Sequence, residues 1–329
     1  MQQQFLSIET ASELAQFLNL LFYQLEEIIN NPFYKHHVIK KKRGGKRELF
    51  APAKTLKRLQ KRFNRCLQNY YADIKPDGIH GFTINSGSKE GYCNIVENAK
   101  PHVGKKHILN IDLKDFFPNI SAHRVKQLFE SPLFDYNEHI AAALTLLTTY
   151  RGRLPTGAPT SPIISNFICF QLDVALKTYC EVYNGLIYTR YADDLTFSSN
   201  SPISDQTLFE IREIIEKNNF RINEKKIRLK SFSQKQTVTG LVVNEKVNVE
   251  RKFLKKVRAM LHDATANGID SAAQRHFNLK DTPTDKQRLT FISRLEGYVN
   301  FIGQVKGKNN LVYLRFKEML NKKSLYLQS

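Results

Sequence analysis

The sequence predicts an α+β protein with a small antiparallel sheet and a helical C-terminal region. Residues 187–198 read as two short strands, rich in aromatic and β-branched residues, that meet at a tight Ala-Asp-Asp turn. Residues 108–113 form a further, strongly apolar strand pattern. From Glu250 onward the chain has the spacing of helices with frequent Lys and Arg. Together these patterns favour a sheet backed by helices, followed by a separate helical region.

The charge of the chain points to a polyanionic partner. Its 329 residues contain 50 Lys and Arg against 31 Asp and Glu, a formal net charge of +19. Such an excess destabilises the compact state by self-repulsion, which a nucleic acid would relieve, although a generic basic surface is the alternative. No apolar run approaches the ~20 residues that span a bilayer, and the first residues lack the basic start of a secretory signal. We therefore expect a cytoplasmic protein with no membrane role.

Several common kinds of site are excluded by their missing motifs. The four cysteines are scattered without a Cys-x-x-Cys pair, which argues against a zinc site or a disulfide scaffold. Neither a GxxxxGK(S/T) nor a GxGxxG phosphate loop occurs, so ATP-driven or dinucleotide chemistry has no support.

The N-terminal third predicts helices around a basic hairpin. Residues 10–30 carry apolar residues at helical spacing, which predicts one or two helices. Residues 40–50 have the form of a hairpin with a Gly-Gly turn flanked by cations, which lets backbone amides and charges approach a phosphate. A solvated charged hairpin is the alternative. Residues 55–71 predict an amphipathic helix with a basic face.

The central part alternates strands, loops and helices. The strand at 108–113 places Asp112 near its end, and a helical pattern spans roughly 123–150. A stretch rich in Pro and Gly at 154–162 then leads into a helix of about 163–182. The break near 244–250 predicts a domain boundary.

Three carboxylates stand at predicted strand ends: Asp112, Asp193 and Asp194. Adjacent carboxylates repel each other, so a hard divalent cation held by oxygen ligands would explain the Asp-Asp turn, whereas a solvated acidic hairpin is the alternative. Phosphoryl transfer uses two such ions about 3.5–4 Å apart, which aspartates from different strands can bridge. With the basic chain and the Pro/Gly-rich loop, the set argues for a nucleic-acid polymerase.

The same segments resemble the reverse transcriptases. Tyr191-Ala192-Asp193-Asp194 matches their catalytic motif, residues 112–117 match the motif that supplies the first catalytic aspartate, and residues 154–162 resemble the loop against nucleotide and template. The segments NAKPH at 98–102 and VTGLV at 238–242 are similar to marks of bacterial retron reverse transcriptases. The resemblance covers roughly residues 40–250.

The resemblance implies a right-hand polymerase with fingers, palm and thumb, in which the palm is an antiparallel sheet backed by helices. We expect an N-terminal helical segment at 1–39, fingers and palm at 40–245, and a helical thumb that recognises RNA at 246–329.

For the metal centre, the resemblance makes Asp112 and Asp193 the principal ligands, with Asp194 assisting and the Leu113 backbone carbonyl as a further candidate. The expected cofactor is a pair of Mg²⁺ ions, for which Mn²⁺ can substitute.

For the nucleotide, the resemblance makes Phe117 a steric gate, because an aromatic ring beside the sugar leaves no room for a 2′-hydroxyl. Arg47 is preferred for bidentate phosphate binding. The expected dNTP-binding residues are Lys46, Arg47, Phe116, Phe117 and Gly157. Many relatives have glutamine where this chain has Thr156, so the role of that position is left open.

For RNA and primer, the resemblance singles out two motif residues before the palm, a turn like a primer grip, and cations of the thumb. Asn98 and His102 are given a structural or RNA-contacting role rather than a catalytic one. Solvated charge is the alternative for the thumb cations. The expected residues are Asn98, His102, Thr239, Gly240, Arg251, Lys255, Lys256 and Arg258.

The activity implied by the resemblance is RNA-directed DNA synthesis on a cognate retron non-coding RNA, using dNTPs and primed from a guanosine 2′-hydroxyl. Its cDNA product would be a branched RNA–DNA hybrid (msDNA), and antiphage defence with a separate effector protein is expected. The alternatives are a group II intron-like or diversity-generating reverse transcriptase, and a catalytically idle RNA-binding scaffold. The identity of the RNA, branch guanosine, effector, oligomeric state and phage trigger stay open.

Overall fold

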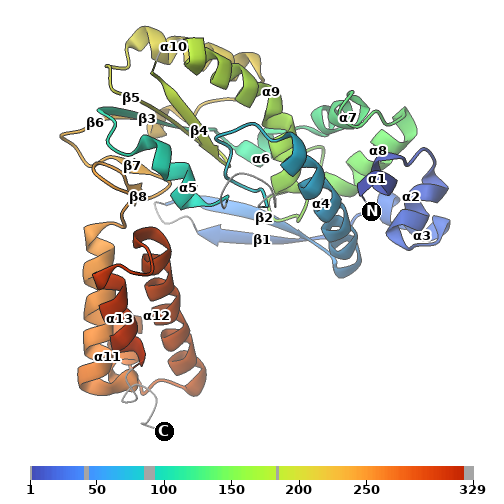
Figure 1. The fold of residues 1–329 in the computed structure, drawn as a ribbon. Coiled ribbons are helices and arrows are strands. Elements are labelled where there is room, and N and C mark those ends of the chain that lie inside the picture. Colours follow the sequence, from blue (N-terminus) through green and yellow to red (C-terminus); the bar gives the residue numbers. More distant parts are fainter. Residues whose placement is uncertain (1, 41–43, 85–92, 183–184, 322–329) are drawn as a thin grey trace. The chain divides into compact units, whose positions relative to one another are not determined.

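The computed structural model describes residues 2–40, 44–84, 93–182 and 185–321, so positions 41–43 of the predicted basic hairpin lie outside the described residues (Figure 1). The chain forms two compact units. Unit 1 comprises residues 1–98 and 106–230, and unit 2 comprises residues 99–105 and 231–329. The predicted bounds of fingers, palm and thumb stay predictions.

Unit 1 is organised around a four-stranded sheet in the order β4-β5-β3-β6. Its strands are β3 (His107–Asp112), β4 (Ile187–Tyr191), β5 (Asp194–Ser199) and β6 (Arg228–Ser231). β5 pairs antiparallel with both β3 and β4. The predicted antiparallel sheet and α+β class are therefore confirmed.

Long helices cover this sheet. α9 (Ser161–Val182) packs against β4, and α10 (Asp205–Lys217) packs against α9 (Figure 1). Leu172 and Leu176 of α9 are buried, as are Leu195 and Phe197 of β5. The short helix η2 (Glu224–Lys226) precedes β6. Burial on both sides explains why α9 and the central strands are apolar through most of their length.

The N-terminal region has three short helices before a long one, and the first of them packs against the long helix. They are α1 (Gln2–Leu6), α2 (Ala11–Leu18) and α3 (Phe22–Asn30), and the long helix is α4 (Lys54–Ile74). Thr10 and Glu13 form a capping box at the start of α2. The helices predicted at 10–30 and 55–71 are thus confirmed.

The hairpin predicted at 40–50 belongs to a longer antiparallel pair of strands, β1 (Tyr34–Lys40) and β2 (Lys46–Pro52). Gly44 and Gly45 both have positive φ, the conformation that such a turn requires of glycine.

The single helix predicted at 123–150 is wrong. Two helices stand there, α7 (Ala122–Glu130) and α8 (Glu138–Thr148). Pro132 disfavours helical backbone at Ser131, which caps the first helix, and Asn137 starts the second by accepting from the Ile140 amide. The short helix α6 (Phe116–Asn119) precedes them.

Unit 2 is mainly helical, as predicted. α11 (Arg251–Phe277), α12 (Asp285–Lys306) and α13 (Leu311–Asn321) pack on one another. A two-stranded ribbon, β7 (Thr237–Val238) and β8 (Leu241–Val242), precedes them. The helix α5 (Ile95–Ala99) ends where the short η1 (Lys100–His102) of unit 2 begins. None of the described helices combines the length and the apolar character that crossing a membrane requires.

Candidate active site

The sheet brings the three predicted carboxylates to one end. β3 and β5 pair so that Asp112 lies opposite Asp194, and Asp193 immediately precedes that residue in the turn. The Leu113 amide also donates to the Asp193 carbonyl at 2.9 Å, which ties the end of β3 to the turn. Two segments far apart in the chain therefore present their carboxylates together.

The turn itself is tight and bent by an unusual residue. β4 ends at Tyr191 and β5 begins at Asp194, so Ala192 and Asp193 make the connection. Ala192 is buried and has φ of +59°, a left-handed conformation that costs about 1 kcal/mol for a residue with a Cβ. A conformation of this kind persists only when surrounding contacts hold it.

The carboxylates repel one another electrostatically. Burial and the neighbouring charge of Asp112 raise the pKa of Asp193. Although Asp194 reaches solvent, the surrounding protein and the charges of Asp193 and Asp112 raise its pKa to about 6. Lys226 partly offsets this repulsion, because its Nζ donates to Asp112 Oδ1 at 2.5 Å. The site thus concentrates negative charge that a cation would neutralise.

The donor set fits a hard divalent cation, since it consists of carboxylate oxygens from two strands at one sheet end. Within the described ranges, no three His, Cys, Asp or Glu side chains are already grouped closely enough to hold one ion. Asp112 meanwhile has hydrogen bonds from Lys226 and from Asn223 Nδ2, the latter at 3.3 Å. The ligand roles of Asp112, Asp193, Asp194 and Leu113 stay predictions.

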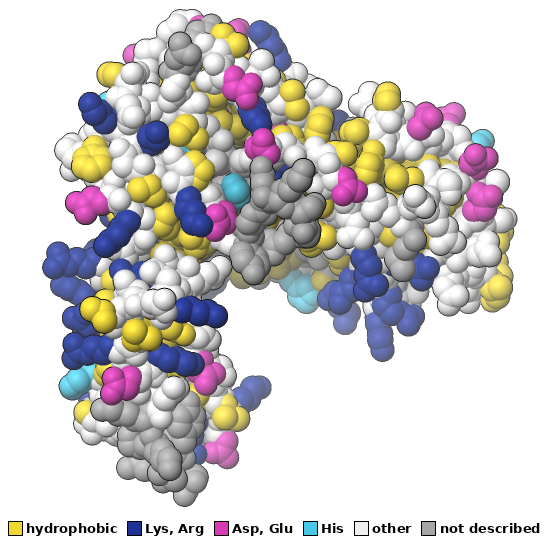
Figure 2. All heavy atoms as spheres, in the orientation of Figure 1, with side chains coloured by type: hydrophobic (Ala, Val, Ile, Leu, Met, Phe, Trp, Pro, Cys, Tyr) yellow, Lys and Arg dark blue, Asp and Glu magenta, His cyan; other side chains and the backbone are white. Residues whose placement is uncertain are grey.

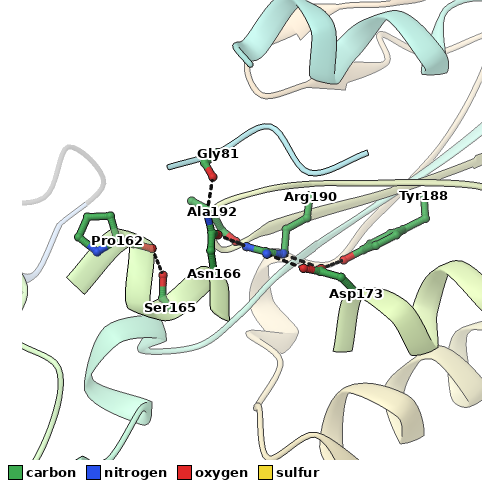
Figure 3. A network of polar contacts seen from close by, with 8 residues as sticks. All are labelled: Gly81, Pro162, Ser165, Asn166, Asp173, Tyr188, Arg190 and Ala192. Carbon is green, nitrogen blue, oxygen red and sulfur yellow. Dashed lines mark hydrogen bonds and ion pairs between the residues drawn. The ribbon is translucent and has the colours of Figure 1, made fainter. Parts of the chain in front are cut away.

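A buried ionic network lies beneath the turn (Figure 3). Arg190 of β4 is fully buried and forms two hydrogen bonds with Asp173 of α9, Nη2 to Oδ2 at 2.6 Å and Nε to Oδ1 at 2.7 Å. Its Nη1 donates to the Ala192 carbonyl at 3.1 Å and to Asn166 Oδ1 at 3.0 Å. Tyr188 also donates to Asp173 Oδ1. The guanidinium therefore connects the core helix directly to the backbone of the turn.

Gly81 lies very close to the backbone of the same turn. A Cβ at this position would lie 2.2 Å from the Ala192 nitrogen and 2.8 Å from the Tyr191 carbonyl carbon, both backbone atoms. Asn166 Nδ2 donates a hydrogen bond to the Gly81 carbonyl oxygen at 3.0 Å (Figure 3). Asn166 thus joins the Gly81 segment to Arg190, and the turn lies between them.

The predicted phosphate-binding cations lie on β2. Lys46 and Arg47 are exposed, and the charge of Arg47 is one of those that lower the pKa of Asp193. Arg47 is therefore coupled electrostatically to the carboxylate turn. Both roles stay predictions.

The Pro/Gly-rich loop at 154–162 is hydrogen-bonded to β2. The Phe50 amide donates to the Thr156 carbonyl at 2.8 Å. Gly157 has φ of +116°, and a Cβ there would lie 3.2 Å from the Phe50 carbonyl oxygen. Thr156 therefore joins the loop to β2 through its backbone carbonyl. This contact does not depend on whether the side chain is threonine or glutamine.

The two phenylalanines after Asp112 have different surroundings. Phe116 is buried and stacks on Phe220 with ring centroids 6.0 Å apart, so its ring belongs to the core. Phe117 is half-buried and stacks on Phe82 at 5.8 Å. Phe117 is thus the more exposed of the two rings, and the nucleotide roles of both residues stay predictions.

The residues predicted to bind RNA and primer differ in exposure. Asn98 and His102 are fully buried. This burial favours a structural role over direct contact with RNA. Thr239 and Gly240 form the β7–β8 turn with φ of +47° and +83°. On α11 the predicted cations are all exposed, and Lys256 lies over the Tyr298 ring. These cations are Arg251, Lys255, Lys256 and Arg258.

Sequence reasoning missed the residues that support the turn: Asp173, Asn166, Arg190, Gly81 and Lys226. A signal was present for two of them. Arg190 is a cation inside an otherwise uncharged strand, and Asp173 is a carboxylate amid apolar residues of α9. A lone buried charge of each sign predicts a pair.

Comparison with known proteins agrees with this geometry. The profile of the family described as "Reverse transcriptase (RNA-dependent DNA polymerase)" matches residues 39–258. The chain is 36% identical over 276 residues to the retron Ec86 reverse transcriptase of Escherichia coli, which covers 80% of this chain and 81% of that protein. It is 33% identical over 270 residues to the retron Mx65 reverse transcriptase of Myxococcus xanthus, which covers 74% of this chain and 60% of that protein.

Proposed function

The chain belongs to the retron reverse transcriptases and is an RNA-directed DNA polymerase, and we propose that it copies a cognate structured RNA into single-stranded DNA from a guanosine 2′-hydroxyl. It has the right-hand, α+β fold of its family. The observation that carries the proposal is the convergence of Asp112, Asp193 and Asp194 at one sheet end of a chain that is 36% identical to a retron enzyme.

The family uses divalent metal ions, and we propose two Mg²⁺ for this chain, replaceable by Mn²⁺. Asp112, Asp193 and Asp194 would hold them, with the Leu113 carbonyl as a further ligand. When bound, such ions lower the pKa of the attacking hydroxyl and neutralise the leaving group. The convergent carboxylates, the raised pKa of Asp194 and the exposure of that side chain support this assignment.

The remaining groups position the substrates. Each cycle is an in-line attack of the primer hydroxyl on the dNTP α-phosphate, with pyrophosphate leaving. Arg47, with a planar fork of donors, would bind the triphosphate, and Phe117 would pack against the sugar. Arg190 and Gly81 would keep the turn, and therefore Asp193, fixed during the reaction.

The partner and priming proposals have direct tests. Nucleic acid that copurifies with the protein is sequenced, and we expect one structured RNA joined to its cDNA. Digestion with ribonuclease should leave a DNA whose 5′ end retains a short branched oligoribonucleotide, because the branch guanosine has no free 2′-hydroxyl to support cleavage on its 3′ side. Recovery of linear cDNA only, with an ordinary 3′-hydroxyl primer, would contradict priming from a 2′-hydroxyl.

We also propose a role in antiphage defence with a separate effector protein, and a cytoplasmic location. Similarity to retron enzymes supports both proposals. Cells that carry the chain with its neighbouring genes should resist phage infection, and the same cells with Asp193→Asn should not. Equal plaque counts on the two strains would remove the defence role.

Replacing Phe117 by Ala should relax discrimination against ribonucleotides. The half-buried ring would no longer fill the space beside the 2′ position of the incoming sugar. We expect the ratio of kcat/KM for dNTP over rNTP to fall about 10- to 100-fold, as loss of a steric contact of about 1–3 kcal/mol implies. Phe82→Leu, which alters only the ring behind Phe117, is the control. An unchanged ratio in Phe117→Ala would remove the gate role.

Replacing Gly81 by Ala should displace the catalytic turn. The added methyl would overlap the Ala192 nitrogen at 2.2 Å, so backbone must move. A displacement of about 1 Å at the reacting groups costs about 100-fold in rate, and we expect kcat to fall by this amount. Gly297→Ala, where a Cβ meets nothing within 4 Å, is the matched control and should retain activity. A fully active Gly81→Ala enzyme would contradict this positioning role.

Two alternatives remain outside the proposal. A group II intron-like or diversity-generating enzyme would copy RNA without forming a branched product, which the ribonuclease digestion separates. A catalytically idle RNA-binding scaffold would bind RNA but not extend a primer in the presence of Mg²⁺. The intact set of three carboxylates favours an active enzyme over a scaffold.

A further inference from the structure

A second feature of unit 1 is a basic groove that the catalytic site does not include. It is a cavity of about 420 Å³ between the end of α2 and the N-terminal half of α4. Asn19 and Leu20 lie on one side, and Arg58, Lys61, Arg62 and Arg65 line the other. We call this cavity, with its cationic wall on α4 and the apolar side chains of Leu18 and Leu59, the basic groove.

The four cations form one continuous face. Their positions follow helical spacing of three, four and seven residues, so their side chains leave the same side of α4. Between Glu48 and Asp73 the chain has six Lys or Arg and no carboxylate. In the described part of the chain, no ion pair joins any of the four to an acidic side chain. Their charge is therefore directed toward an outside partner.

One of the cations is held in place by packing. The Arg62 guanidinium lies over the Phe17 ring, 4.9 Å from its centroid, and its Nε is buried without a hydrogen-bond partner. Arg58, Lys61 and Arg65 are exposed along the same helix. Figure 2 shows dark blue side chains gathered near the lower end of α4, which is its N-terminal half in Figure 1.

The chemistry of the groove fits a nucleic-acid strand better than a single anion. Positions 58 to 65 extend about 10 Å along the helix, enough for successive phosphates of one strand. Leu20 is followed directly by Leu21, Phe22 and Tyr23, which are 60%, 46% and 61% exposed. Exposed aromatic rings beside a row of cations are typical of surfaces that bind single strands by stacking and charge.

We propose that the basic groove binds the phosphate backbone of a single-stranded segment of the RNA that this enzyme copies. The inference rests on the proposed function, because it takes the enzyme's own RNA as the polyanion. None of the groove residues belongs to the carboxylate site or its supporting network. The groove therefore contributes to RNA affinity and its salt dependence, and leaves the chemical step unchanged.

The test compares two double variants of the same helix in the full-length protein. Lys61→Gln/Arg65→Gln removes two exposed charges from the groove, and Lys54→Gln/Lys57→Gln removes two exposed charges that do not line it. Binding of a fluorescein-labelled single-stranded RNA of mixed sequence is measured by anisotropy over a range of salt. Because the two changes are equal in charge, a general electrostatic effect should be the same in both variants.

We expect the groove variant to bind RNA about tenfold more weakly near physiological salt, with its log–log salt slope reduced by about 1.4 for two lost phosphate contacts. The control should remain close to the wild type. Extension of a saturating, pre-annealed DNA primer on RNA should proceed at wild-type kcat in both. Equal losses in the two variants, or wild-type affinity in the groove variant, would overturn the proposal.

Two further outcomes distinguish RNA from an acidic protein as the partner, and failure of the groove proposal from failure of the proposed function. If the groove variant binds RNA normally but no longer binds poly-aspartate, the groove recognises an acidic protein and the RNA proposal is overturned. The proposed function fails separately, if the wild-type enzyme cannot extend a primer on RNA with dNTPs. The RNA-binding comparison does not depend on that extension result.

Discussion

Replacing Asp193 with asparagine is expected to lower the rate of dNTP incorporation at least about a thousandfold, since several kcal/mol of transition-state stabilisation depends on charge at this site. The amide has nearly the same shape but lacks the negative charge that ligates a hard cation. RNA affinity should be nearly unchanged, because the turn carries no cation that contacts phosphate. The measurement is single-turnover primer extension with Mg²⁺, alongside RNA binding on the same preparation.

The same substitution should make the fold more stable in the absence of divalent ions. Burial and Asp112 raise the pKa of Asp193, so the folded protein holds this carboxylate less favourably than the unfolded chain does at neutral pH. Removal of the charge relieves that repulsion, and the melting temperature should rise. Loss of activity together with a higher melting temperature cannot be explained by misfolding.

The matched control is Asp115→Asn, in the same segment as Asp112. Asp115 is exposed and has φ of +47°, a conformation that asparagine also adopts readily. The control should therefore keep both its activity and its stability. Near wild-type incorporation by Asp193→Asn would remove this carboxylate from the catalytic assignment.

The elements that carry this site were predictable because their signals are local. The aromatic and β-branched residues on either side of Ala192 predicted β4, β5 and the turn, and the apolar run before Asp112 predicted β3. The gap between α7 and α8 also had a local signal, Pro132, which a reading of hydrophobic spacing alone overlooked.

The supports of the turn were not predictable in the same way, because they depend on contacts between distant segments. The sequence around Gly81 gives no sign that a Cβ there would overlap the Ala192 nitrogen, because this close approach is created by packing in unit 1. Lys226 ends the short helix η2 and reaches Asp112 only because β6, which follows, lies next to β3. Arg190 and Asp173 each had a signal as buried charges, but their contact with the Ala192 carbonyl required the three-dimensional arrangement.

Replacing Asp173 with alanine is expected to lower the free energy of unfolding by about 3–5 kcal/mol, because Arg190 would be left buried without its counterion. Both side chains of this pair are fully buried, so water cannot take the place of the lost carboxylate. Urea unfolding of the full-length protein, followed by circular dichroism, measures the loss. The control is Asp77→Ala, which breaks the exposed ion pair with Lys177 of the same helix and should cost less than about 1 kcal/mol. Equal losses in the two variants would contradict the role of the buried pair.

A double substitution separates stability from positioning. Arg190→Met/Asp173→Leu removes both charges and fills the space with apolar atoms, a change that is often neutral or stabilising by about 1–4 kcal/mol. The Ala192 carbonyl, however, loses its donor from Arg190 Nη1, and the left-handed turn loses one of the contacts that hold it. We expect this variant to unfold at nearly the wild-type urea concentration while its kcat falls about 10- to 100-fold, the cost of a catalytic group held less accurately. If stability and kcat both return to wild-type values, the pair serves only the fold; if stability returns alone, Arg190 positions the turn that carries Asp193.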